Sequence, residues 1–142
     1  MCIRDSPYAR ITSARGVSLD DLLEKSDIVF LHTHVTDETR DMVDDEFIQK
    51  MKDGSFLINT ARGELVKEDS IINALEQRKL RGYGTDVIRD EFGNHNESKL
   101  VDYSMNPHSG VIITPHIGGM TIEGQTKAYH YAINKFRSVN ND

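Results

Sequence analysis

The sequence predicts an α/β domain in which a parallel β-sheet is flanked by helices. Short runs of consecutive apolar residues recur along the chain. Such runs are typical of strands in parallel sheets, which are covered on both faces. Segments with helical patterns separate these runs. Because strands and helices alternate, we expect a parallel sheet whose connections are right-handed crossovers.

The first half of the chain predicts two helices and one strand. A helix is expected over residues 19–25, because Ser18 and Asp21 form a pair resembling a capping box. A continuously apolar strand, covered on both faces, is expected at 28–31. A second helix is expected at 44–51, where acidic residues occupy the first turn.

The next segment predicts a second strand followed by the strongest helical pattern in the chain. The strand is expected at 55–61. The helix is expected within 67–82, with acids at its start, Arg78 and Lys79 near its end, and Gly82 as its C-cap.

The last third of the chain predicts two more strands and a closing helix. A weaker strand is expected at 83–88 and a stronger one at 110–116. The polar stretch 89–110 is expected to be a surface loop with one helical turn. A closing helix is expected at 121–137. Its apolar residues available for packing are Ile122, Tyr129, Ile133 and Phe136.

The composition limits the possible classes of protein. With 142 residues, 37% hydrophobic and 28% charged, the chain fits one globular domain with a sizeable core. The net charge of -6 argues against a nucleic-acid partner. No run approaches the roughly 20 apolar residues that span a bilayer, and no signal-peptide core is present. We therefore expect a cytoplasmic protein without a membrane partner. The single Cys2 excludes an internal disulfide framework.

Candidate site residues follow the predicted strands. In an open parallel sheet, ligands bind beyond the carboxyl ends of the strands. Arg62, Glu91 and His116 follow three successive strands and are expected at that edge. A guanidinium can hold a carboxylate through two parallel hydrogen bonds. An imidazolium can protonate a carbonyl oxygen as hydride arrives, and a neighbouring carboxylate would orient its ring. Hydride itself requires a nicotinamide cofactor.

Simpler interpretations compete with this one. Each of the three residues could be an ordinary strand-end charge or a histidine satisfied by its backbone neighbours. His32 and His34 lie two residues apart on an extended segment and could suggest zinc. Without a third well-spaced ligand, no metal site is expected.

The chain from about Pro7 to Phe136 resembles the NAD-binding domain of the D-isomer-specific 2-hydroxyacid dehydrogenases. The matching segments are "LLEKSDIVFLH", "MKDGSFLINTARGELV", "ALEQRKLRGYGTDV" and "ITPHIGG". The resemblance implies a partial Rossmann-like, doubly wound parallel sheet with flanking helices. It also implies Arg62 as the catalytic arginine, Glu91 as the catalytic acid and His116 as the acid/base histidine.

The resemblance also implies contacts to NAD, with NADP not excluded. His34 stands where the family commonly has proline, and Phe92 stands where a proline usually follows the catalytic glutamate. No adenosine-ribose acid is assigned, because Ser6 occupies that position. The cofactor-binding residues implied are Thr33, His34, Thr39, Thr60, Ala61, Arg62, Asp86, His116, Gly118 and Gly119.

The domain organisation expected is a non-native leader at residues 1–6 and a partial NAD-binding domain at 7–142. We expect that it lacks the G-x-G-x-x-G turn, the first strand and a separate substrate domain. We expect a fragment of an oxidoreductase that transfers hydride between NAD(H) and a D-2-hydroxy acid/2-oxo acid pair. Alone it should turn over little, and the full-length protein should be a homodimer. The alternatives are an NAD-sensing corepressor-like protein-binding module and a non-binding α/β domain.

Overall fold

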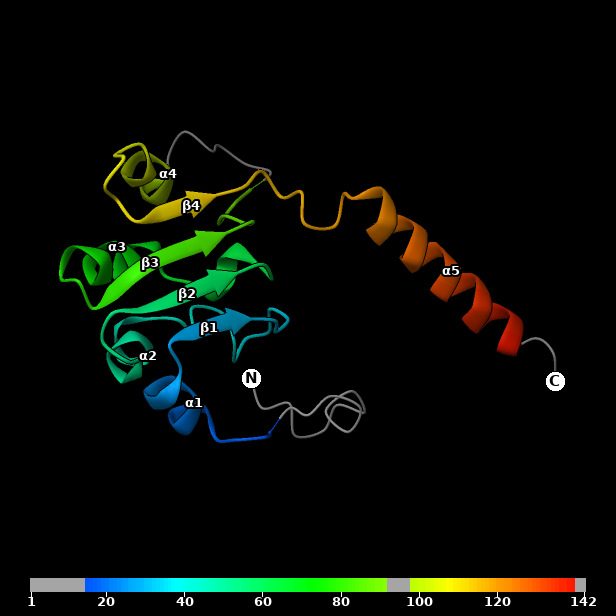
Figure 1. The fold of residues 1–142 in the computed structure, drawn as a ribbon, viewed down its shortest axis with the longest axis horizontal. Coiled ribbons are helices and arrows are strands. Elements are labelled where there is room, and N and C mark those ends of the chain that lie inside the picture. The colour runs from blue at the N-terminus through cyan, green and yellow to red at the C-terminus, as the bar shows by residue number, and fades with distance from the viewer. Residues whose placement is uncertain (1–14, 92–97, 140–142) are drawn as a thin grey trace.

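A four-stranded parallel sheet forms the centre of the molecule (Figure 1). The structure is a computed structural model that describes residues 15–91 and 98–139. The expected leader and Phe92 lie outside these ranges. The strands pair in the order β1-β2-β3-β4, and the predicted α/β parallel sheet is confirmed. They are β1 (Ile28–Leu31), β2 (Ser55–Asn59), β3 (Leu80–Thr85) and β4 (Val111–Ile113).

The helices occupy most of the segments between strands, as predicted. Ser18 caps the first helix, and its hydroxyl accepts a hydrogen bond from the Asp21 amide at 3.1 Å. The second helix begins after Asp44, whose carboxylate accepts from the Phe47 amide at 3.1 Å. Both caps satisfy amides that the first helical turn leaves unpaired. The helices are α1 (Leu19–Lys25), α2 (Asp45–Lys50), the 3-10 helix η3 (Gly63–Leu65), α3 (Glu68–Glu76), α4 (Lys99–Ser104) and α5 (Ile122–Val139).

The end of α3 differs from the prediction. The helix ends at Glu76, and Gly82 lies inside β3 instead of capping the helix. Arg78 adopts the left-handed conformation (φ 58°) that glycine usually supplies at this position. Its amide bonds to the Leu75 carbonyl at 3.1 Å, and the Lys79 amide bonds to the Ala74 carbonyl at 2.9 Å. These two hydrogen bonds close the turn, so β3 starts three residues earlier than expected.

The core lies between one face of the sheet and the helices. Leu57 of β2 and Ile71 of α3 are fully buried there. On the opposite face no described helix covers β1, so the predicted cover on both faces of this strand is wrong. Ile28 and Phe30 are 50% and 55% exposed, because alternate residues of a strand point to opposite faces.

The closing helix is longer than predicted and does not pack as expected. α5 projects away from the sheet (Figure 1), and Ile122, Tyr129 and Ile133 are 81%, 69% and 48% exposed. Phe136 is also exposed. The spacing of apolar residues along α5 is compatible with packing, but a periodic pattern does not identify the surface that would cover the helix. Across residues 15–91 and 98–139, no helix combines the length and apolar character needed to cross a bilayer.

Candidate active site

His116 lies in a tight turn directly after β4, which we call the β4 exit (residues 114–118). The Thr114 amide donates to the Thr85 carbonyl at 2.9 Å, so the sheet pairing with β3 continues to the start of this turn. The His116 amide then donates back to the Thr114 carbonyl at 2.9 Å, and His116 has a φ of 52°. Non-glycine residues rarely adopt positive φ, and such conformations cluster at functional sites. The turn therefore needs support from its surroundings.

Asp86, which follows β3, supplies that support. Its carboxylate accepts hydrogen bonds from the Ile117 amide at 3.0 Å, the Gly118 amide at 2.8 Å and the Thr114 hydroxyl at 2.5 Å. Burial by itself would raise the pKa of Asp86, but the hydrogen bonds from Thr114, Gly118 and Ile117 lower it below its ordinary value of 3.8. A charged carboxylate thus holds the β4 exit from two sides of His116.

The close approach to Asp86 explains the first of the two glycines after His116. A Cβ atom on Gly118 would lie 2.9 Å from Asp86 Oδ2. A side chain would therefore push against the carboxylate that accepts the Gly118 amide. Gly119 has nothing within 4 Å of an added Cβ, so the space beside it is open.

Glu91 lies against the imidazole of His116. Glu91 Oε1 and His116 Nδ1 are 2.5 Å apart. An ionised carboxylate only accepts hydrogen bonds, so Nδ1 carries the proton in this pair and the ring is fixed through that atom. Nε2 remains as the nitrogen that can exchange a proton with a ligand. The His116 side chain is 40% exposed and the Glu91 side chain 24%, which leaves the ring accessible.

Arg62 lies in the segment that begins at the last residue of β2, which we call the β2 exit (residues 59–63). Buried Asn59 shapes this segment: its side-chain oxygen accepts from the Ala61 amide at 3.0 Å, and its side-chain nitrogen donates to the Arg62 carbonyl at 2.9 Å. The exposed guanidinium donates from Nη1 to the Ala61 carbonyl at 2.6 Å. Sequence reasoning missed Asn59, although it lies three residues before Arg62 in the same motif.

The β2 exit touches the loop that leads to Glu91. A Cβ atom on Gly63 would lie 2.2 Å from the carbonyl carbon of Ile88 and 2.4 Å from the Arg89 amide nitrogen. Only glycine permits this backbone contact. Arg62 precedes the contact by one residue, and Glu91 follows Ile88 by three. The structure therefore brings the three predicted catalytic residues to adjoining segments at the carboxyl edge of the sheet.

The predicted residues after β1 belong to a loop that is closed on itself. The Thr39 hydroxyl donates to the His34 carbonyl at 2.7 Å and accepts from the Thr36 amide at 2.8 Å. This hydroxyl is therefore occupied by the chain. His32 and His34 are both exposed, and the ring of His32 stacks parallel to that of Phe30 with the ring centroids 6.1 Å apart. Within the described part of the chain, no three His, Cys, Asp or Glu side chains are grouped to hold a metal ion.

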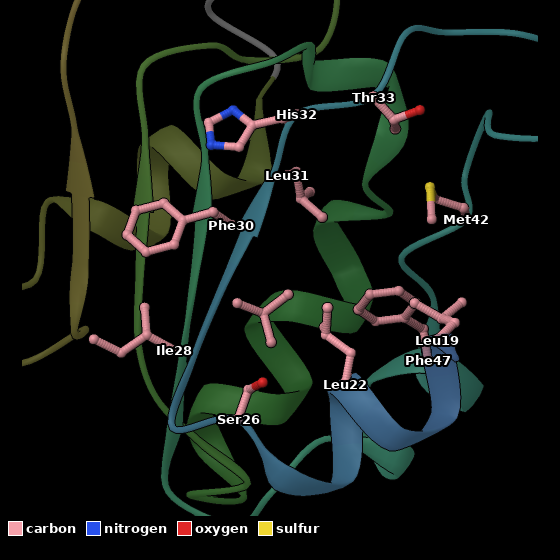
Figure 2. A pocket seen from close by; sticks show the side chains of 11 residues that line it. Leu19, Leu22, Ser26, Ile28, Phe30, Leu31, His32, Thr33, Met42 and Phe47 are labelled. Carbon is pink, nitrogen blue, oxygen red and sulfur yellow. The ribbon is translucent and has the colours of Figure 1, made fainter. Parts of the chain in front are cut away.

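Thr33 borders a pocket of about 330 Å³ along β1, which forms one edge of the sheet. Figure 2 shows Ile28 and Phe30 on one side of β1, with Leu22 and Phe47 on the other. The lining is predominantly apolar. Such a lining suits a flat or apolar group better than a charged one.

The carboxyl edge of the sheet fits the nicotinamide end of a dinucleotide. Thr33 and exposed Thr60 offer hydroxyls, Ala61 offers a small side chain, and the space beside Gly119 is open. Hydroxyl and backbone groups are suitable partners for a carboxamide. Asp86 and Thr39 offer less to a cofactor, because the carboxylate already accepts three hydrogen bonds from the chain and the hydroxyl is bonded within its own loop.

Comparison with known proteins identifies the family. Residues 4–118 match the profile of "D-isomer specific 2-hydroxyacid dehydrogenase, NAD binding domain". The chain belongs to this family. It is 35% identical over 126 residues to 4-methyl-2-oxopentanoate reductase A of Aspergillus oryzae, covering 89% of this chain and 36% of that protein. It is also 35% identical over 129 residues to glyoxylate reductase of Thermofilum pendens, covering 91% and 36%.

Solved structures of the family have the same fold. D-lactate dehydrogenase from Aquifex aeolicus, crystallised with NAD and lactic acid, matches with a TM-score of 0.70 and 35% identity. The match covers 87% of this chain and 40% of that enzyme. The chain therefore spans between 36% and 40% of the length of these three relatives. All three are reductases or dehydrogenases, so they do not support the corepressor alternative.

Proposed function

We propose that this chain forms part of an oxidoreductase that transfers hydride between NAD(H) and a D-2-hydroxy acid/2-oxo acid pair. The observation that carries the proposal is the contact between His116 Nδ1 and Glu91 Oε1, at 2.5 Å, at the carboxyl edge of the sheet. This contact leaves Nε2 available, and the β2 exit presents an exposed Arg62 from an adjoining segment.

His116 acts as the acid in reduction and as the base in oxidation. When hydride reaches the carbonyl carbon of a 2-oxo acid, the carbonyl oxygen gains negative charge and takes the proton from Nε2. Glu91 stabilises the charged imidazolium before transfer and keeps the ring oriented. The reverse reaction returns the hydroxyl proton to Nε2. A histidine held through Nδ1 can therefore serve both directions.

Arg62 binds the carboxylate of the substrate. Its guanidinium uses one N–H on the Ala61 carbonyl at 2.6 Å, and its fork can still meet a carboxylate through two parallel bonds. The same cation polarises the adjacent carbonyl group. A 2-oxo acid offers both groups on neighbouring carbon atoms, which suits one guanidinium and one imidazole.

The cofactor supplies the hydride when it is bound. Thr33, Thr60, Ala61 and Gly119 would hold its nicotinamide end, and Asp86 would act on it only through the β4 exit. We further propose that the protein is cytoplasmic and acts as a homodimer at full length, without nucleic-acid or membrane partners. The net charge of -6 supports the exclusion of nucleic acid.

A chimaera tests the proposal. Since the chain spans 36% to 40% of its relatives, we expect the 142 residues alone to show no measurable NADH-dependent reduction of a 2-oxo acid. Replacing the matched segment of the Aquifex aeolicus enzyme by residues 15–137 should give NADH-dependent reduction of a 2-oxo acid. In this chimaera, His116→Gln should lower kcat by about 10²- to 10⁴-fold. An unchanged kcat would refute the assignment of His116, and His108→Gln, on an exposed histidine, is the matched control.

A further inference from the structure

Arg89 connects the loop that leads to Glu91 with two other segments. Its Nη2 atom forms an ion pair with Asp41 and donates a hydrogen bond to the Val66 carbonyl at 2.8 Å. The Glu64 carbonyl lies 3.4 Å from the same atom. The Arg89 and Asp41 side chains are 30% and 36% exposed. The Arg89 side chain is thus less exposed than the cationic side chains of most other ion pairs among the described residues. One side chain thus meets two segments that are remote from it in sequence.

The two segments that receive Arg89 are themselves joined. The Asp41 amide donates to the Glu64 carbonyl at 2.9 Å, and the Val43 amide donates to the Leu65 carbonyl at 2.9 Å. The Lys67 amide completes the series with a 3.0 Å bond to the Val43 carbonyl. Backbone hydrogen bonds therefore pair two short segments, residues 41–43 and residues 64–67, and the second of these directly follows the β2 exit in sequence.

We propose that Arg89 is a positioning residue that sets the distance between the β2 exit, which carries Arg62, and the loop that carries Glu91. This inference rests on the proposed function, since it names how two groups of that site are kept in register. Gly63 and Ile88 prevent the two segments from moving closer, because their backbones are already in contact. Arg89 prevents them from moving apart. Glu91, two residues after Arg89, is then held against His116.

The chemistry of the three acceptors suits arginine. The guanidinium is planar, always charged and able to direct N–H groups to a carboxylate and a carbonyl at the same time. Lysine carries the same charge as a compact point on a flexible stem. Asp41 has a φ of 57°, a conformation that aspartate and asparagine tolerate better than most residues. Asp41→Asn therefore removes the charge without changing the backbone preference.

The test compares Arg89→Met, Arg89→Lys and Asp41→Asn in the 142-residue chain. The control is Lys52→Met. It removes the long-range ion pair between Lys52, which precedes β2, and Asp27, which precedes β1. The first readout is the NMR signal of the His116 Nδ1 proton, which reports the contact with Glu91. The second is amide hydrogen exchange at residues 63–66 and 88–91. Neither readout requires NAD or turnover.

We expect Arg89→Met to weaken or abolish the Nδ1 proton signal and to speed exchange in both segments on the order of tenfold. Arg89→Lys should keep part of the proton signal and part of the protection from exchange. Asp41→Asn should weaken both readouts to an intermediate degree, and Lys52→Met should leave both unchanged. An unchanged proton signal and unchanged exchange in Arg89→Met would overturn the inference. If the variants behave as expected but the chimaera lacks 2-oxo acid reduction, the proposed function fails while the positioning role stands.

Discussion

The β2 exit and the β4 exit each present one side chain of the proposed site, but they are held by different means. Asn59 shapes the β2 exit through two hydrogen bonds within three residues of itself. The β4 exit depends on Asp86, which lies about 30 residues earlier in the chain and accepts from Thr114, Ile117 and Gly118. The Arg62 segment is thus shaped locally, whereas the His116 turn requires that β3 and β4 are already paired.

This difference separates the chemical roles of two carboxylates beside His116. Glu91 is partly exposed and contacts the imidazole itself. Asp86 is buried and accepts from the Thr114 hydroxyl before His116 and from the Ile117 and Gly118 amides after it. In the proposed reaction, Glu91 would orient the imidazole that transfers the proton, whereas Asp86 would position the turn that carries it.

Gly63→Ala should break the contact between the β2 exit and the loop after β3, with the largest effect on stability. An added Cβ would lie 2.2 Å from the Ile88 carbonyl carbon, so one backbone must move. We expect a loss of about 3 kcal/mol in the free energy of unfolding. Urea unfolding followed by circular dichroism measures it. Gly16→Ala is the control, because nothing lies within 4 Å of its added Cβ. Equal midpoints for both variants would show that the contact is not tight.

Local features of the structure could be predicted from the sequence more fully than features that depend on long-range contacts. Apolar runs predicted each of the four strands, although β3 starts three residues earlier than expected. The common direction of parallel strands predicted that Arg62, Glu91 and His116 lie at one edge. Ser18 and its acidic partner identified the start of α1. These signals are local, since each depends on residues within one or two helical turns or one strand.

The remaining features depend on contacts that no local pattern contains. The pairing of Arg89 with Asp41 spans 48 residues, and nothing near either residue indicates its partner. The end of α3 was misplaced because Arg78 takes the conformation expected of Gly82. Cover on both faces of β1 was inferred from its continuous apolar run, but burial depends on what packs on each face. Ile28 and Phe30 are therefore apolar and exposed.

Asn59→Ala should loosen the β2 exit while sparing the β4 exit. The substitution leaves the Ala61 amide and the Arg62 carbonyl without their side-chain partner and opens a cavity at a fully buried position. We expect a loss of about 2.5 kcal/mol in the free energy of unfolding. The NMR signal of the His116 Nδ1 proton should persist, because its contact with Glu91 is independent of Asn59. Disappearance of that signal in the folded variant would show that the two exits are not independent.

Asp86→Asn should loosen the β4 exit while sparing the β2 exit. Compared with Asn59→Ala, we expect a smaller loss of stability and a larger change in the turn that carries His116. The amide cannot accept all three hydrogen bonds with the strength of a carboxylate, so we expect a loss of about 2 kcal/mol at pH 7. Hydrogen bonds lower the pKa of Asp86 in the folded state, so its contribution to stability is present above the ordinary value of 3.8 and is lost as pH falls through the lower folded pKa. The stability difference between wild type and variant should therefore shrink below about pH 4. A difference that stays constant from pH 7 to pH 3 would contradict this role.

Thr114→Val, which removes only the hydroxyl donor, should lower the free energy of unfolding by about 1 kcal/mol and leave the amides of Ile117 and Gly118 protected from exchange. If Thr114→Val released those amides as fully as Asp86→Asn, the hydroxyl would hold the carboxylate in place, and the β4 exit would depend on Thr114 as much as on Asp86.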